Sequence, residues 1–101
     1  MKILDGLKVL DLTTIVSGPY AASLLADLGA DVIKVEPPSP GDSARVFEST
    51  EPRYTMQGLS PHIMTLSRNK RGIVINLRNA NGKRTFDDLV RWADVVIDNY
   101  R

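Results

Sequence analysis

Polar side chains follow four apolar runs, and these are the places where the sequence could carry chemistry. Ligands of open parallel sheets collect at the carboxyl ends of the strands, so such polar groups are candidates for one shared site. The first segment contains Gly18-Pro19, where a helix N-terminus would offer free N–H groups to an anion. A simple strand-to-helix turn explains Gly18-Pro19 equally well. The candidate segments are residues 13–18, 36–42, 76–79 and 98–101.

Glu36 is a candidate for contact with a nucleotide ribose, because it ends an apolar run 18 residues after Gly18. Dinucleotide-binding folds place an acid near this position. The turn at Gly18 has a single glycine instead of the G-x-G-x-x-G trio, which argues against a nicotinamide or flavin cofactor. The alternative is that Glu36 faces water or pairs with Lys34 or Arg45.

Basic side chains gather around the third apolar run and could hold phosphates through charge-assisted hydrogen bonds. A solvated basic turn is the alternative. His62 has no Ser, Cys or Asp at a spacing diagnostic of catalysis, so we expect it at the surface or at a helix start. The residues of this basic group are Arg68, Asn69, Lys70, Arg71 and Arg78.

Composition limits the classes of function. The 101 residues include 13 Lys+Arg and 12 Asp+Glu, and the net charge of +1 gives no reason to expect a nucleic-acid partner. With no cysteine and one histidine, a disulfide scaffold, a Cys nucleophile and a His- or Cys-based metal site are excluded. The start of the chain, MKILDG, lacks the apolar run of a signal peptide or a membrane span. We therefore expect a soluble, cytoplasmic protein without a metal.

The elements that must position these residues follow from the apolar patterns. Strands are expected over residues 7–12, 31–36, 73–77 and 94–98, and helices over 19–28, 61–67 and 79–93. The order β-α-β-loop-β-α-β predicts an α/β fold, a Rossmann-like parallel sheet with flanking helices. Two sets of apolar residues at helical spacing should face the sheet: Ala21, Leu24, Leu25 and Leu28, and Phe86, Leu89, Val90 and Ala93.

Two features indicate that the sheet is incomplete. Residues 37–61 hold five of the six prolines, which predicts a long functional or flexible loop. The fourth strand ends just before Arg101, and two long helices are few for a parallel sheet covered on both faces. We therefore expect residues 1–101 to be the N-terminal part of a longer protein, poorly soluble or partly unfolded alone. A complete four-stranded domain with one partly bare face is the alternative.

Taken in order, several segments resemble the opening of the class III CoA-transferases, which include formyl-CoA transferase, carnitine CoA-transferase and α-methylacyl-CoA racemase. The resemblance covers essentially the whole chain, and DLGADVIKVE followed by GD-x-x-R is its most specific part. The segments are Gly6–Leu12, Gly18-Pro19, Leu25–Pro38, Gly41–Arg45, Asn69–Arg71 and Ala93–Arg101.

The resemblance implies a Rossmann-like domain that binds coenzyme A or acyl-CoA, in a longer protein that forms an interlocked homodimer. It implies transfer of CoA between carboxylic acids through an aspartyl intermediate, with that aspartate beyond residue 101 and no catalytic residue in this chain. One alternative is a fragment of an α-methylacyl-CoA racemase, which uses a His/Asp pair. Another is a non-catalytic nucleotide-binding remnant.

Residue by residue, the resemblance implies a CoA site. Val16 and Ser17 match positions beside the thioester end of CoA. The adenosine part is expected at Ile75, Asn76, Leu77 and Arg78, and the CoA groove at Asn99, Tyr100 and Arg101. Three positions depart from formyl-CoA transferase: Thr14 and Val16 replace His and Gln, and Pro37 replaces a CoA-contacting Arg. The departures at Thr14 and Val16 argue against specific oxalate–formate chemistry.

Overall fold

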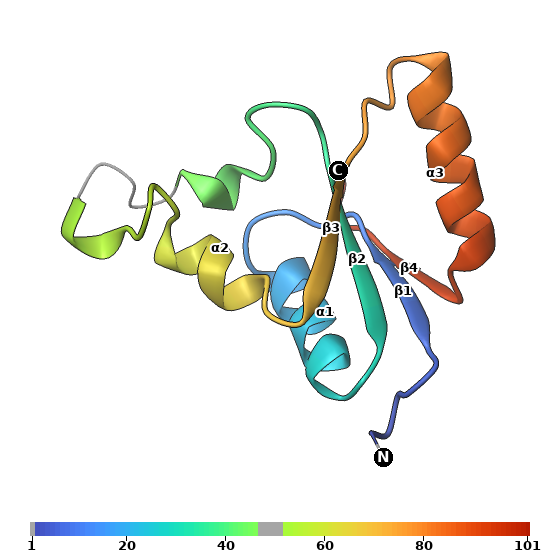
Figure 1. Cartoon of the computed structure of the whole chain (residues 1–101), viewed down its shortest axis with the longest axis horizontal. Helices are drawn as coiled ribbons and strands as arrows, with labels where there is room; N and C mark the ends of the chain where they lie inside the picture. Colours follow the sequence, from blue (N-terminus) through green and yellow to red (C-terminus); the bar gives the residue numbers. More distant parts are fainter. Residues whose placement is uncertain (1, 47–51) are drawn as a thin grey trace.

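A computed structural model describes residues 2–46 and 52–101 as strands and helices in alternation (Figure 1). Two single-turn 3₁₀ helices, Ser43–Arg45 and Pro52–Tyr54, lie between β2 and α2. In chain order the main elements are β1 (Lys8–Asp11), α1 (Ser17–Asp27), β2 (Asp31–Glu36), α2 (Pro61–Leu66), β3 (Lys70–Val74), α3 (Ala80–Trp92) and β4 (Val95–Ile97).

The four strands form one parallel sheet in the order β3-β2-β1-β4. Val9 in β1 pairs with Val32 of β2 on one side and with Val95 of β4 on the other. This arrangement confirms the predicted Rossmann-like parallel sheet with flanking helices. Since all four strands are parallel, their carboxyl ends lie at the same end of the sheet. The strand order reverses between β1 and β4.

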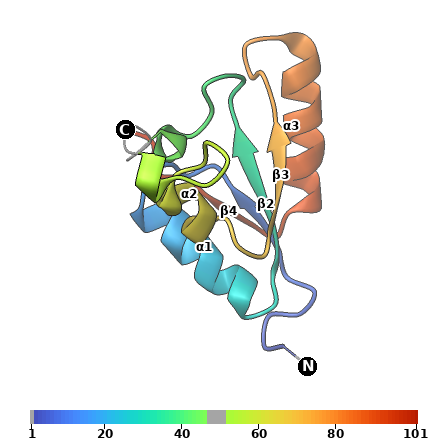
Figure 2. The same cartoon turned by 60° about the vertical axis from the view of Figure 1, so that its left-hand side comes forward.

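The two long helices cover opposite faces of the sheet (Figure 2). Successive side chains of a strand point to opposite faces, so Val9 packs toward α1 while Leu10 packs toward α3. Both residues are fully buried. The α1 side of the core contains Val9, Ala22, Ala26, Ala30 and Val32, and the α3 side contains Leu10, Leu12, Ile33, Val35 and Ile75 with Phe86 and Leu89 packed against them.

The predicted inward face of α1 is correct for Leu25, which packs against the core, and wrong for Ala21, Leu24 and Leu28. Leu24 and Leu28 are exposed, whereas the small residues Ala22 and Ala26 are buried against the sheet. The alanines allow the helix backbone to approach the strands closely, so the larger leucines turn outward. On α3 the predicted face is correct for Phe86, Leu89 and Ala93, while Val90 is exposed.

The third strand begins earlier than predicted. Lys70 and Arg71 pair in register with Val32 and Ile33 of β2, so these two residues, expected just before a strand over 73–77, are themselves part of the strand. Arg71 is tolerated there because it is exposed on an edge strand and pairs with Asp31, whereas the Lys70 side chain is buried and is neutralised by Asp11. Asn76 and Leu77 consequently lie beyond the strand end, in the connection to α3.

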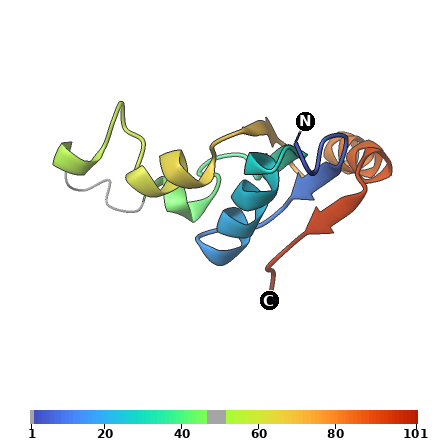
Figure 3. The ribbon, with the colours of Figure 1, turned by 90° about the horizontal axis from the view of Figure 1, so that it is seen from below.

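The described residues between β2 and β3 extend away from α3, on the side of α1 (Figure 3). The loop expected over 37–61 contains the two 3₁₀ turns among its described residues, and its residues 47–51 lie outside the described part of the chain. The helix predicted over 61–67 is α2, whose first turn is capped by Ser60. Ser23 of α1 ties α2 to the sheet layer, because its hydroxyl donates to the Leu66 carbonyl at 2.7 Å. Among the described residues, no helix combines the length and apolar character needed to cross a bilayer.

Candidate functional site

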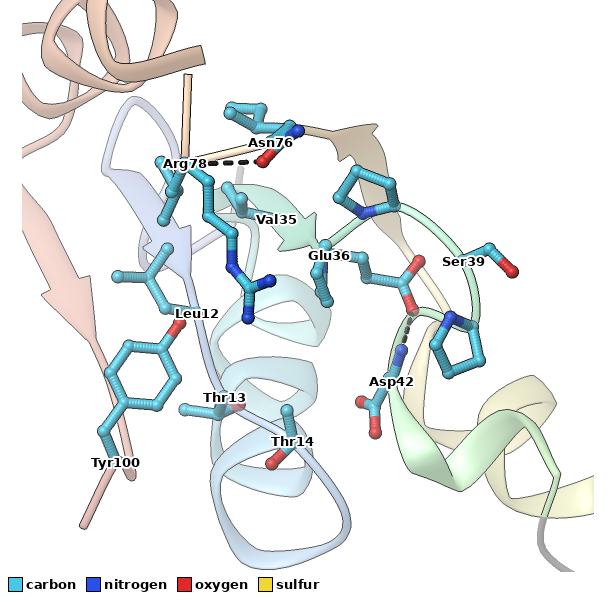
Figure 4. Close-up of a pocket in the computed structure, with 15 residues that line it drawn as sticks. Leu12, Thr13, Thr14, Val35, Glu36, Ser39, Asp42, Asn76, Arg78 and Tyr100 are labelled. Carbon is cyan, nitrogen blue, oxygen red and sulfur yellow. Dashed lines mark hydrogen bonds between the residues drawn. The ribbon is translucent and has the colours of Figure 1, made fainter. Parts of the chain in front are cut away.

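A cavity of about 530 Å³ lies at the carboxyl ends of the strands (Figure 4). All four segments that the sequence indicated contribute to it, and residues that follow β1 and β4 both line it. These two strands flank the point where the strand order reverses, the usual ligand position in this fold. Its lining includes Leu12, Thr13, Thr14, Val35, Glu36, residues 37–40, Asp42, Ile75, Asn76, Leu77, Arg78 and Tyr100.

The cavity has an apolar wall and a cationic rim. Leu12, Val35 and Ile75, which lie at or near the ends of three neighbouring strands, are buried and supply the apolar wall. Arg78 is exposed, and its side chain extends into the space between Tyr100 and Glu36 (Figure 4). Within the described residues, the Arg78 guanidinium makes no hydrogen bond or ion pair. It is therefore available to an anionic ligand.

The backbone directs Arg78 toward the cavity. Asn76 Oδ1 accepts a hydrogen bond from the Arg78 N–H at 3.0 Å, which closes a tight turn directly after β3. Asn79 then caps α3, because its Oδ1 accepts from the Gly82 N–H at 2.7 Å. The strand end, the turn and the helix start together fix the position of Arg78.

Glu36 is bound to Arg45, as one of the two sequence-based readings predicted. Arg45 Nε and Nη2 donate to the two Glu36 carboxylate oxygens at 2.8 and 2.7 Å. Oε1 also accepts from the Asp42 N–H at 3.0 Å. The Arg45 guanidinium has the largest effect on the pKa of Glu36 and lowers it, and the Asp42 N–H lowers it further. Burial raises the pKa, but the net effect is a pKa below the ordinary value. Both oxygens of Glu36 are therefore engaged within the protein.

A buried ion pair joins Lys34 of β2 to Asp42, whose Oδ2 lies 2.8 Å from Lys34 Nζ. The short separation makes this an ion pair, although its geometry is not that of a well-directed hydrogen bond. Burial by itself would raise the pKa of Asp42. Lys34 and the N–H groups of Ala44 and Ile15 outweigh burial, so the pKa lies below its ordinary value.

Asn99 contributes by holding the turn between β1 and α1. Its amide accepts from the Thr14 N–H at 3.1 Å and donates to the Thr14 carbonyl at 2.9 Å. Asn99 does not line the cavity, but Thr14 does. The structure therefore places this expected CoA-site residue outside the cavity, where it is exposed and hydrogen-bonded to the backbone of Thr14.

The remaining residues predicted for the CoA site are divided. Ile75, Asn76, Leu77, Arg78 and Tyr100 share the main cavity. Val16 lines a second cavity of about 280 Å³ with Pro61, His62, Thr65 and Leu66. Ser17 is exposed at the start of α1, and Arg101 is exposed outside both cavities. His62 stands in the first turn of α2, as predicted.

The expected basic cluster does not form. Arg68 pairs with Asp27 at 2.6 Å, Lys70 with Asp11 at 2.9 Å and Arg71 with Asp31 at 2.7 Å. Lys70 and Arg71 begin β3, while Arg78 follows its end, so the strand separates them. No group of three acidic or histidine side chains is placed to hold a metal in the described ranges 2–46 and 52–101.

The sequence indicated the segment 36–42 as a whole but did not single out Asp42 or residues 37–40 as parts of the cavity lining. Their segment was indicated because it follows a strand. What linked Asp42 to the turn at Ile15 is a contact across 27 residues, for which the sequence carries no periodic signal.

Acid should weaken the fold through Glu36 and Asp42. Each has a folded pKa below its ordinary value, 4.5 for Glu and 3.8 for Asp, so its stabilisation is present above that value and is lost as pH falls through the folded pKa. We expect the urea midpoint to fall steeply below about pH 4.5. Glu36→Gln should lower stability near neutrality but flatten this slope, and an unchanged slope would contradict the assignment.

Comparison with known proteins relates the whole chain to one family. The family described as CoA-transferase family III matches residues 4–101. The chain is 39% identical over 104 residues to succinyl-CoA:glutarate CoA-transferase of Mus musculus, covering 99% of the chain and 22% of that protein. It is 40% identical over 97 residues to acetyl-CoA:oxalate CoA-transferase of Acetobacter aceti, covering 96% of the chain and 24% of that protein.

Solved structures give the same relation. A CAIB/BAIF family protein from Brucella suis superposes with a TM-score of 0.87 at 40% identity, over 98% of the chain and 26% of that structure. The protein Rv3272 from Mycobacterium tuberculosis superposes with a TM-score of 0.84 at 37% identity, over 100% of the chain and 26% of that structure. The chain thus spans about a quarter of the length of these relatives.

Proposed function

This chain belongs to CoA-transferase family III, and from that premise we propose that its main cavity binds the nucleotide part of coenzyme A. The protein that carries the chain would transfer CoA between carboxylic acids. The single observation that carries the proposal is the partner-free Arg78 guanidinium beside the apolar wall of the cavity, as seen within the described residues.

The chemistry of the cavity suits the nucleotide end of CoA. An adenine ring is flat and its two faces can pack on apolar side chains, which matches the wall formed by Leu12, Val35 and Ile75. A guanidinium binds phosphate through paired N–H groups, so Arg78 is suited to a phosphate of the same ligand. Tyr100 adds an exposed ring at the rim.

The likeness to known proteins supports CoA recognition more than any particular acid. The relatives named above carry different acids in their names, glutarate and oxalate, while both names contain a CoA thioester. A segment that resembles both at 39% and 40% identity is suited to the part of the reaction that they share. We therefore leave the acid substrate open and assign CoA to this segment.

We further propose that residues 1–101 form the N-terminal part of the CoA-binding domain and hold no catalytic residue. Glu36 and Asp42, the carboxylates that line the main cavity, are both held in ion pairs. A nucleophilic aspartate would then come from elsewhere in the protein. Exposed Tyr20, Leu24 and Leu28 on α1 support a further layer of protein there, from the same chain or from a second subunit of a homodimer.

An exchange assay tests the transferase proposal in the protein that carries this segment. Labelled CoA should move from succinyl-CoA to a carboxylic acid within a broad panel of acceptors. Failure of exchange across the panel, with exchange of the α-proton of a branched acyl-CoA in heavy water instead, would overturn the transferase proposal in favour of a racemase.

Arg78→Gln should weaken CoA binding by about 10- to 100-fold, because a hydrogen bond to a charged group contributes about 1.5–3 kcal/mol. Calorimetric titration with CoA measures the effect. Arg91→Gln is the matched control, since Arg91 lies on α3 in an exposed pair with Asp88 and does not line the cavity. Equal affinities for the two variants would contradict the role of Arg78.

A further inference from the structure

The turn between β1 and α1 separates the two cavities. Thr13 and Thr14 line the main cavity, while Val16 lines the smaller one. Between them, Ile15 has a φ of +73°, in the left-handed region that β-branched residues rarely adopt. Its side chain is 43% exposed, so burial of the side chain does not explain this backbone conformation. Other contacts must hold the turn.

Asp42 and Lys34 supply those contacts from beneath the turn. Asp42 Oδ1 accepts from the Ile15 N–H at 3.2 Å and from the Ala44 N–H at 3.0 Å. Lys34 Nζ donates to the Thr13 carbonyl at 2.9 Å while its charge faces Asp42. The two side chains therefore hold the backbone on both sides of Thr14. Both side chains are buried, with exposures of 1% for Asp42 and 5% for Lys34.

The position of Asp42 is itself fixed. Its N–H donates to Glu36, which Arg45 holds through two hydrogen bonds. The Ser60 hydroxyl donates to the carbonyl of neighbouring Ala44 at 2.5 Å. This shell leaves Asp42 little freedom to move, so it can act as a rigid support for the turn.

We propose that Asp42, with Lys34 as its counter-ion, is a positioning residue that holds Ile15 in the left-handed conformation and so sets the wall between the two cavities. This inference rests on the proposed function, because the wall matters for activity only if CoA binds beside it. Asp42 acts through the Ile15 N–H and the Thr13 carbonyl contact of Lys34. Its role is therefore to place backbone groups, and it does not take part in group transfer.

The charge of Asp42 is essential to this role. An asparagine could still accept from the Ile15 and Ala44 N–H groups through its oxygen. Its amide N–H₂ would then face the Lys34 ammonium, which brings two donors together in a buried place. Asp42→Asn should therefore release the turn even though it preserves the shape of the side chain.

A double-mutant cycle tests the proposal through CoA affinity. Asp42→Asn should weaken CoA binding by about tenfold, which corresponds to the free energy of about one hydrogen bond. Ile15→Gly lets the backbone adopt a positive φ without strain, so the same Asp42→Asn change should cost less than about threefold when added to Ile15→Gly. Asp88→Asn, which breaks an exposed pair on α3, is the control and should leave affinity unchanged.

The possible outcomes separate this proposal from the proposed function. An Asp42→Asn penalty that is equal with and without Ile15→Gly overturns the positioning role. If Asp42→Asn does not fold, Ile15→Gly should restore folding, and failure to do so also overturns it. If the parent protein does not bind CoA, the proposed function fails. Hydrogen exchange of the Ile15 amide then still tests the contact, because Asp42→Asn should accelerate it and an unchanged rate contradicts the proposal.

Discussion

Replacing Asp11 with alanine is expected to lower the free energy of unfolding by about 3–5 kcal/mol, because it leaves a buried ammonium without its partner. Lys70 Nζ lies 2.9 Å from Asp11 Oδ2, and their side chains are 1% and 0% exposed. The N–H and hydroxyl of Thr13 also donate to Asp11. Urea denaturation of the parent protein and of the Asp11→Ala variant near neutral pH measures the loss of stability.

Asp31→Ala is the matched control for this experiment. It removes the pair between Asp31 of β2 and Arg71, the residue after Lys70 in β3, but those side chains are 46% and 63% exposed. Exposed pairs contribute about 0–1 kcal/mol, so this variant should remain close to the parent. Adding Lys70→Met to Asp11→Ala should recover part of the loss. Similar losses for Asp11→Ala and Asp31→Ala would contradict the view that burial makes the Asp11 pair important.

Gly82→Ala should disrupt the turn that carries Arg78. A Cβ at Gly82 would overlap the carbonyl oxygen of Asn76 and lie 2.6 Å from its carbonyl carbon. Backbone atoms cannot rotate away as a side chain can, so the first turn of α3 must shift. We expect a loss of about 3 kcal/mol in stability, at the upper end for an overpacked site. CoA affinity should fall by more than about tenfold, because Asn76 and Arg78 line the cavity.

Gly72→Ala provides the control, since a Cβ at Gly72 in β3 meets no atom within 4 Å. Thermal denaturation followed by circular dichroism and calorimetric titration with CoA give the two readouts. Gly72→Ala should match the parent in both. If Gly82→Ala also matches the parent, the close approach of α3 to the end of β3 does not fix the site.

The sheet could be predicted because its strands have simple signals. The strand Asp31–Glu36 was located to the residue, since its β-branched residues Val32, Ile33 and Val35 lie between Gly29 and Pro37. The buried face of α1 was not predicted in the same way, because leucine ranks above alanine in side-chain hydrophobicity and the exposed Leu24 and Leu28 were therefore assigned to the core. In the structure Ala22 and Ala26 face the sheet, because their small side chains allow the helix to pack closely against the strands. Periodicity reports which residues are apolar and does not report how closely a helix approaches.

For the site, the sequence could predict which segments follow the strands, but it could not predict which of their side chains face the cavity. That Arg78 lies at the cavity while Arg68 and Arg71 do not depends on where Asp27 and Asp31 are in space. The sequence brings all three arginines into one short stretch, so it suggested one cluster. Likewise, Lys34 stands within a buried strand, and its partner Asp42 follows an irregular loop. Such pairings arise from tertiary structure and leave no local pattern.

Photolabelling with an azido-adenine analogue of CoA tests the central claim most directly, that the main cavity receives the nucleotide end of CoA. The protein carrying this segment is labelled with and without excess CoA, digested and examined by mass spectrometry. The proposal predicts label on peptides containing residues 75–78 or 37–40, which line the cavity, and loss of that label with excess CoA. Label that persists in excess CoA, or that falls wholly outside the lining residues, would contradict it.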